Sequence, residues 1–230
     1  MTRRIRGILF DFNGTLFFDS RMHMDAFAET CRRYSKEPFS DEYMINNVFG
    51  RTNTRIFKEN FKADATDLEC EVFNDVKKKL YFDACLSRPE RMHLVDGAAQ
   101  MLDYLSANSI PFALATGSDR EELDFFMEHL GLGRWFDFDK NIVFTDGSFR
   151  GKPEPDCYIL AAEKIGLIPE ECAVFEDGRS GIAAAHAAGC TRVVAISETG
   201  IPAPFDSPDE VTAAYNSLSD WRNALILLGL

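Results

Sequence analysis

The 230-residue chain has few basic residues for its number of acidic ones, 25 against 37, and its formal net charge is −12. Nucleic acids and anionic membrane surfaces attract basic proteins, so neither is an expected partner. The sequence has no apolar run of transmembrane length. Its basic start, Met1–Arg6, lacks the long apolar stretch and small-residue cleavage site of a signal peptide. These absences predict a cytoplasmic protein, with a monomer as the default state.

Closely spaced cysteine pairs are also missing. The sequence contains no CxxC pair, and its six cysteines are scattered: Cys31, Cys70, Cys85, Cys157, Cys172 and Cys190. We interpret them as reduced thiols, mostly in the core, rather than as disulfides or metal ligands.

Apolar runs typical of buried strands alternate with helical segments in most of the chain. The expected strands are 5–10, 112–115, 142–144, 173–175 and 193–196, with an edge strand at 213–215. The expected helices between them are 98–107, 121–130, 155–166 and 181–188. This alternation predicts an α/β fold with a Rossmann-like, doubly wound parallel sheet.

A polar, helix-rich block interrupts this pattern just after the first strand. Amphipathic helices are expected there at 23–34, 41–48, 54–60 and 67–86. We therefore predict an α/β core of residues 1–18 and 93–230 and an inserted all-α domain of residues 19–92. An insertion at this point would lie above the carboxyl end of the first strand, where a lid would lie.

Polar residues follow the ends of four predicted strands, and a parallel sheet brings such strand ends to one edge, where ligands bind. These residues are Asp11, Thr116 with Gly117, Lys152, and Glu176 with Asp177. A carboxylate can attack phosphorus and form an acyl phosphate, and grouped acids attract Mg²⁺. A hydroxyl, an ammonium and backbone N–H groups suit the phosphoryl oxygens. The pattern indicates phosphoryl transfer.

These residues lie in motifs that resemble the four ordered motifs of the haloacid dehalogenase superfamily. The motifs are Asp11-Phe12-Asn13-Gly14-Thr15-Leu16, Thr116, Gly151-Lys152-Pro153-Glu154-Pro155-Asp156 and Glu176-Asp177. Gly181 and Ala184–Gly189 resemble the β-phosphoglucomutase and phosphoglycolate-phosphatase branch, whose helical cap follows the first strand. The resemblance implies a Mg²⁺-dependent phosphatase that acts on a small phosphorylated metabolite through an aspartyl phosphate.

The resemblance also implies residue roles in the α/β core. Asp11 would be the nucleophile and a Mg²⁺ ligand, and Asn13 would offer its backbone carbonyl to the metal. Asp177, with Glu176, would complete the metal site. The phosphoryl group would be held by Thr116, Gly117 and Lys152.

In the predicted cap, His23 matches a hinge histidine of the branch, and Lys77 lies near the position of a substrate-binding lysine. Arg51 and Asn53 are further candidate substrate residues. From the residues alone, we interpret the run Lys77-Lys78-Lys79 as a solvated helix face.

Asn13 departs from the family pattern, because the phosphatases usually have Asp there as a general acid and base. Such catalysis contributes about 10²–10⁴-fold, and an amide cannot exchange a proton in this role. The protein could be a slow phosphatase that prefers good leaving groups, or one in which the substrate or His23 handles the proton. It could use a chemistry without the acid, as phosphonate-cleaving relatives do, or bind a phosphorylated ligand without turnover. Asn13 could also be a substitution introduced into the natural sequence. A mutase is a further alternative, although Asn13 weakens it.

Overall fold

The computed structural model describes residues 3–49, 51–199 and 205–230, without the side chain of residue 46. The first two residues of the basic start therefore lie outside the described part. The chain divides into two compact units. We call Met1–Phe18 with His93–Leu230 the core unit, and Asp19–Met92 the helical unit.

In the described part of the core unit, six strands form one sheet in the order β3-β2-β1-β4-β5-β6, and all neighbouring pairs are parallel. The strands are β1 (Gly7–Phe10), β2 (Phe112–Ala115), β3 (Ile142–Val143), β4 (Cys172–Glu176), β5 (Arg192–Ile196) and β6 (Ala213–Tyr215). The strands β2 and β3 lie on one side of β1, and the strands β4, β5 and β6 follow on its other side. The predicted doubly wound α/β fold is confirmed, and its switch point lies between β1 and β4.

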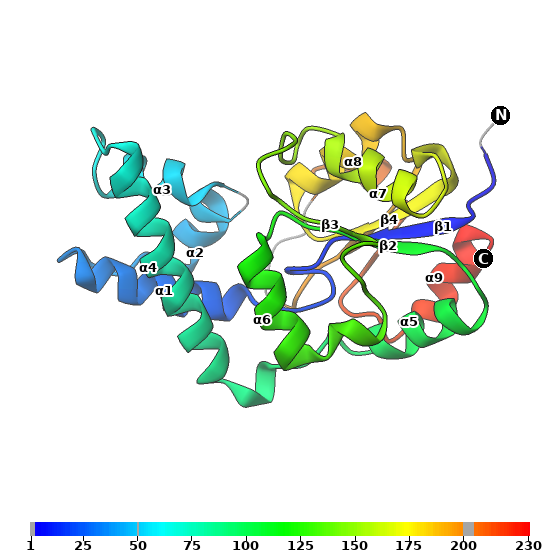
Figure 1. The fold of residues 1–230 in the computed structure, drawn as a ribbon, viewed down its shortest axis with the longest axis horizontal. Coiled ribbons are helices and arrows are strands. Elements are labelled where there is room, and N and C mark those ends of the chain that lie inside the picture. Colours follow the sequence, from blue (N-terminus) through cyan, green and yellow to red (C-terminus); the bar gives the residue numbers. More distant parts are fainter. Residues whose placement is uncertain (1–2, 50, 200–204) are drawn as a thin grey trace. The chain divides into compact units, whose positions relative to one another are not determined.

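Helices cover both faces of this sheet, with α7 and α8 on one face and α5 and α9 on the other (Figure 1). The long helices of the core unit are α5 (Ala98–Ala107), α6 (Arg120–Leu130), α7 (Asp156–Lys164), α8 (Arg179–Ala188) and α9 (Trp221–Leu228). Short 3₁₀ helices are η3 (Leu132–Arg134), η4 (Pro169–Glu171) and η5 (Pro208–Glu210). Helix α9 was not predicted from the sequence, although its buried residues Trp221, Ala224, Leu225 and Leu228 follow helical spacing.

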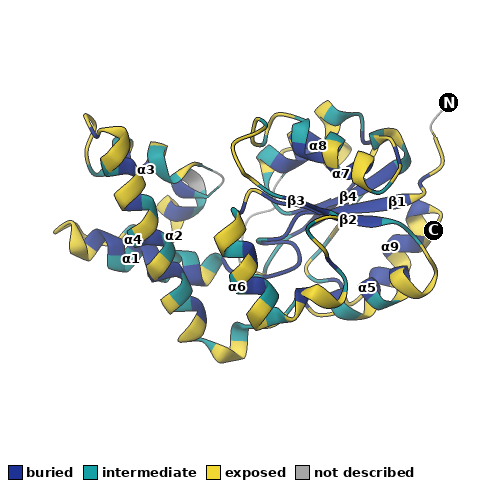
Figure 2. Ribbon diagram, in the orientation of Figure 1, coloured by how far each residue is buried: buried dark blue, intermediate teal, exposed yellow. Residues whose placement is uncertain are grey.

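The central strands β1 and β4 are apolar up to Glu176, the last residue of β4, because both faces of the sheet are covered. Ile8, Leu9 and Phe10 of β1 are fully buried, as are the neighbouring residues of β4 (Figure 2). This is the pattern that a parallel sheet between two helical layers requires. The apolar strands hold the polar residues that follow them at the sheet's carboxyl edge.

The helical unit contains α1 (Ser20–Arg33), α2 (Asp41–Tyr43), α3 (Asn53–Asn60) and α4 (Asp67–Leu86), with a 3₁₀ turn η2 (Pro89–Arg91). The predicted helix 41–48 is α2 followed by a π-helical segment, η1 (Met44–Val48). An aromatic core holds this unit together, with Phe27, Phe57 and Phe73 among its buried members. The α4 helix starts with a capping box between Thr66 and Glu69.

All six cysteines are free and buried. Every helix among the described residues is too short or too polar to cross a membrane.

Candidate active site

Asp11 directly extends β1 at the sheet's carboxyl edge. Its backbone N–H donates to the carbonyl oxygen of Phe175 at 3.0 Å, which continues the β1–β4 ladder. The next residue, Phe12, is fully buried, and its ring centroid lies 4.8 Å from that of Phe126. The buried ring anchors the loop, so the carboxylate of Asp11 and the amide of Asn13 stay at the edge of the sheet.

Gly14 closes the loop and allows Asp177 to approach it. Its N–H donates to the carbonyl of Phe17 at 2.7 Å, and its φ is +78°. A Cβ atom at Gly14 would lie 1.8 Å from Oδ2 of Asp177. Only glycine therefore fits both the left-handed backbone and the close carboxylate.

Three carboxylates meet at the switch point. One ligand oxygen from each of Asp11, Glu176 and Asp177 lies within 4.8 Å of the other two. Asp11 is 7% exposed and Glu176 is 2% exposed. Buried like charges at this separation repel each other unless cations are present. Oxygen ligands in such a group suit a hard divalent cation, so the residues present fit the metal site expected from the sequence.

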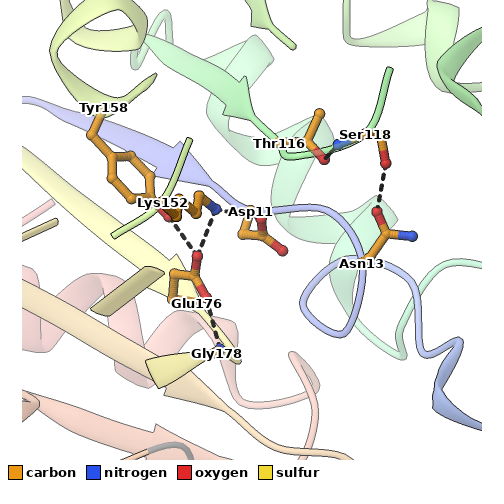
Figure 3. A network of polar contacts seen from close by, with 8 residues as sticks. All are labelled: Asp11, Asn13, Thr116, Ser118, Lys152, Tyr158, Glu176 and Gly178. Atoms are coloured by element: carbon orange, nitrogen blue, oxygen red, sulfur yellow. Dashed lines mark hydrogen bonds and ion pairs between the residues drawn. The ribbon is translucent and has the colours of Figure 1, made fainter. Parts of the chain in front are cut away.

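Lys152 supplies a positive charge to the same cluster. Its Nζ lies 2.5 Å from Oδ1 of Asp11 and 2.6 Å from Oε1 of Glu176 (Figure 3). Burial alone would lower the pKa of this amine, but the two carboxylates outweigh burial and raise its pKa. The loop that carries it is braced by Arg150, whose guanidinium donates to the carboxylate of Asp156 at 2.8 and 3.1 Å. Lys152 is therefore a fixed ammonium beside Asp11.

Tyr158 and Gly178 hold Glu176 in place. The Tyr158 hydroxyl donates to Oε1 at 2.8 Å, and the Gly178 N–H donates to Oε2 at 2.8 Å (Figure 3). Burial, followed by the charge of Glu176, raises the pKa of Tyr158 well above its usual value, so the hydroxyl stays protonated and donates. Tyr158 was not predicted from the sequence. The signal available was its place in the first turn of the helix that follows the lysine loop.

Cys157 is the other nucleophilic side chain near Lys152. Burial raises the pKa of its thiol to about 11, and Lys152 opposes this only in part. The thiolate is therefore scarce near neutrality, which disfavours Cys157 as a nucleophile.

A second group of polar contacts lies on the β2 side of Asp11. Ser118 donates its hydroxyl to Oδ1 of Asn13 at 2.8 Å, and its N–H donates to the Thr116 hydroxyl at 3.1 Å (Figure 3). Asp119, rather than Thr116 or Ser118, caps α6. Nothing would lie within 4 Å of a Cβ at exposed Gly117, so its backbone is open to a ligand. The contact of Ser118 with Asn13 was not predicted from the sequence.

Replacing Lys152 by Met should lower the free energy of unfolding by about 3 kcal/mol, because two buried carboxylates lose their shared cation. Denaturant unfolding with and without MgCl₂ measures this effect. Added Mg²⁺ should restore part of the lost stability if the carboxylates hold it. Lys140→Met, which removes an exposed ammonium paired with Asp137, is the matched control. A Lys152→Met protein as stable as the unaltered one would contradict the buried ion cluster.

Replacing Gly181 by Ala should be destabilising although alanine is the better helix former. A Cβ at Gly181 would lie 1.5 Å from Oε1 of Glu176, inside the acidic cluster. We expect a loss of about 1–3 kcal/mol by denaturant unfolding, because the overpacked carboxylate must move. Gly133→Ala, where a Cβ would meet nothing within 4 Å, should change little. Equal effects of the two substitutions would show that Gly181 does not support Glu176.

The helical unit brings two of its four predicted residues together. Nζ of Lys77 lies 3.0 Å from Nδ1 of His23, and the ring of His23 stacks on that of Tyr81 with centroids 4.2 Å apart. Asp19 connects the same group, because its Oδ2 lies 3.1 Å from Nε2 of His23 and 2.5 Å from the Tyr81 hydroxyl.

The interpretation of the lysine run as a solvated face is wrong for Lys77, which is only 4% exposed. It shares the inward face of α4 with Phe73 and Tyr81, whereas Lys79 is exposed and pairs with Asp83. Residues 73, 77 and 81 are each four apart and therefore lie on one side of the helix, which is the side of α4 that is buried.

The other two predicted residues have local contacts. Arg51 pairs with Glu59 at 2.9 Å, and Asn53 is the first residue of α3, after the N-cap Thr52.

Comparisons with known proteins show which family the chain resembles. Residues 5–189 match the haloacid dehalogenase-like hydrolase family. Fructose-1-phosphate phosphatase YqaB of Escherichia coli K12 is 30% identical over 193 residues, which cover 84% of this chain and 97% of that protein. Hexitol phosphatase A of the same organism is 30% identical over 217 residues, which cover 94% of this chain and 92% of that protein. The crystal structure of a HAD hydrolase, family IA, variant 3, from Entamoeba histolytica HM-1:IMSS is also similar, with a TM-score of 0.83. It is 30% identical and covers 98% of this chain and 100% of that one.

Proposed function

Because this chain belongs to the haloacid dehalogenase-like hydrolase family, we propose that it is a Mg²⁺-dependent phosphatase that forms an aspartyl phosphate on Asp11. The observation that carries this proposal is the buried cluster of Asp11, Glu176 and Asp177 with the ammonium of Lys152 2.5 Å from Asp11. It combines a nucleophile, a cation and a place for a metal at one sheet edge.

The first step is attack by a carboxylate oxygen of Asp11 on the phosphorus of the substrate, with departure of the alcohol oxygen. The ammonium of Lys152 donates to one phosphoryl oxygen as well as to Asp11. The Thr116 hydroxyl and the Gly117 N–H donate to the other phosphoryl oxygens. Asp11, Glu176, Asp177 and the backbone carbonyl of Asn13 would hold Mg²⁺. When bound, the metal supplies positive charge that offsets repulsion between the nucleophile and the phosphate. Water then hydrolyses the acyl phosphate.

Asn13 limits both halves of this reaction. Its side chain can hydrogen-bond to the leaving oxygen or to the attacking water but cannot transfer a proton. We therefore propose slow turnover, a preference for good leaving groups and a long-lived aspartyl phosphate. The alternative in which His23 carries the proton is weaker, because Nε2 lies 3.1 Å from Asp19 and Nδ1 lies 3.0 Å from Lys77.

The proposed substrates are phosphate monoesters of sugars and polyols. Support comes from the two relatives at 30% identity, which are named a fructose-1-phosphate phosphatase and a hexitol phosphatase. We propose that His23, Arg51, Asn53 and Lys77 of the helical unit contribute to substrate selection. Buried Lys77 is the strongest of them, because a buried ammonium beside an imidazole can recognise a hydroxyl or an anionic oxygen.

A phosphatase assay tests this function directly. p-Nitrophenyl phosphate should be hydrolysed with MgCl₂ and not with EDTA, and a panel of sugar and polyol phosphates should then identify the substrate class. A protein that is stabilised against heat by phosphate esters plus Mg²⁺ but releases no phosphate would instead be the ligand-binding alternative.

A further inference from the structure

Asn13 and Gly14 form the one Asn-Gly pair in the whole sequence. In such a pair the backbone nitrogen of the glycine can attack Cγ of the asparagine side chain. The bond from Cγ to the amide nitrogen breaks, ammonia leaves, and a cyclic succinimide forms. Water then opens the succinimide to aspartate or to isoaspartate. Glycine favours the attack because it has no Cβ to obstruct it.

Ser118 assists this attack. Its hydroxyl donates to Oδ1 of Asn13 at 2.8 Å, and this oxygen gains negative charge while the ring closes. A donor fixed on a developing oxyanion lowers the barrier, as it does in acyl-transfer sites. Figure 3 shows this contact on the side of Asn13 that faces the loop after β2. Asn13 is half-buried rather than sealed from solvent, so water can reach it for the second step.

One contact opposes the reaction. The N–H of Gly14 donates to the carbonyl of Phe17 at 2.7 Å, and this bond must open before the nitrogen can attack. The need to open this bond slows the reaction in the folded chain. The change is slow compared with turnover and cumulative with the age of the protein.

We propose that Asn13 is a self-modification site, at which spontaneous deamidation produces the carboxylic acid that the active site lacks. The balance is asparagine plus water giving aspartate plus ammonia, with no other reactant. The effect on activity rests on the proposed function, whereas the modification itself does not. The chain is synthesised in a slow form and becomes faster as Asp accumulates at position 13.

The two products have opposite effects. Aspartate keeps the backbone unchanged and places a carboxyl group beside the Ser118 hydroxyl. Isoaspartate lengthens the backbone by one carbon immediately before Gly14, where a single added Cβ would already lie 1.8 Å from Asp177. The isoaspartyl chain must shift this loop away from the acidic cluster and should be inactive. Activity should therefore follow the aspartyl fraction and not the total loss of asparagine.

A small conversion has a large effect. If an aspartate at position 13 makes the chain about 10²-fold faster, then conversion of about one chain in a hundred doubles the measured activity. Freshly purified and stored samples should differ by a measurable factor even when intact mass barely changes.

The experiment incubates the purified full chain in warm neutral buffer and samples it over days. Each sample is assayed with p-nitrophenyl phosphate plus Mg²⁺ and digested, and the peptide containing residue 13 is resolved into Asn, Asp and isoAsp forms. We expect activity to rise in proportion to the Asp form. Asn13→Gln, whose longer side chain closes a ring far more slowly, should hold a constant activity. Asn108→Asp adds the same charge at an exposed position and should leave activity unchanged.

The outcomes separate this inference from the proposed function. If Asn13→Asp hydrolyses the ester rapidly but the aged chain shows no Asp form, deamidation is excluded and the phosphatase stands. If the Asp form accumulates while neither it nor Asn13→Asp gains activity, the chemical change is real but its activating role is overturned, together with the account of the missing acid. If the Gln protein gains activity at the same rate, the rise has another source and the inference fails.

Discussion

Replacing Asp11 by Asn is expected to lower kcat/KM for p-nitrophenyl phosphate by at least about 10³-fold, because an amide oxygen cannot serve as the nucleophile. Asp11 is the carboxylate on which every later step of the proposed reaction depends. Its oxygen is 2.5 Å from the ammonium of Lys152, and one of its oxygens lies within 4.8 Å of Glu176 and Asp177. Mg²⁺-dependent initial rates measured with freshly prepared proteins check this expectation.

The matched control for this loss is Asp124→Asn, which removes an exposed carboxylate paired with Arg120 on α6. It should leave the rate within experimental scatter, because a surface pair of this kind contributes little. If Asp11→Asn keeps activity within about tenfold of the unaltered chain, the nucleophile lies elsewhere and the assignment of the site is wrong.

Replacing Asn13 by Asp is expected to raise kcat by about 10²–10⁴-fold, with little change in KM. The new carboxyl group can accept the Ser118 hydroxyl as Asn13 does and can exchange a proton with the leaving oxygen and then with water. The gain should be larger for sugar phosphates, whose alkoxides are poor leaving groups, than for an aryl phosphate. Steady-state kinetics on both substrate types measures it.

Ser118 provides the control for this gain. In the Asn13→Asp background, Ser118→Ala should remove part of the increase, because the carboxyl group loses the donor that orients it. The same Ser118→Ala change in the Asn13 background should alter kcat much less. Equal losses in both backgrounds would mean that Ser118 acts on something other than residue 13, and no gain from Asn13→Asp would refute the account of the missing acid.

The acidic residues at the sheet edge could be predicted from the sequence, because each of them follows the end of a predicted strand. Asp11 and Asp177 each follow an apolar run, and parallel strands place such residues side by side at one edge. The structure brings these two together, with Lys152 reaching Asp11 from the loop after β3. This prediction requires only that the strands are parallel, and it does not depend on how far apart the two residues are in the sequence.

The supporting contacts could not be predicted in the same way. Ser118 meets Asn13 across 105 residues of sequence, and Tyr158 meets Glu176 from the first turn of α7. Both contacts depend on side-chain directions that only the packed structure fixes. The burial of Lys77 is a third case, because charge alone suggested a solvated face, whereas the packing of α4 turned this residue inward.

Both the proposed slow turnover and the proposed deamidation depend on Asn13. This residue replaces the usual general acid and is also part of the one Asn-Gly pair in the sequence. A stored preparation therefore mixes a slow chain with a fast one. Kinetic comparisons of variants need material of equal age, with the composition at residue 13 measured alongside each rate.

Trapping the covalent intermediate tests the central claim most directly. The protein is mixed with a phosphorus-labelled sugar phosphate or aryl phosphate and Mg²⁺, quenched in acid at a series of times, and digested for peptide mapping. The label should appear on the peptide that contains Asp11 and should persist longer than in the Asn13→Asp protein, because that carboxyl group speeds hydrolysis of the acyl phosphate. The claim that the reaction passes through an aspartyl phosphate on Asp11 would be contradicted if product formed while the protein carried no label at any time, or if the label appeared on another residue.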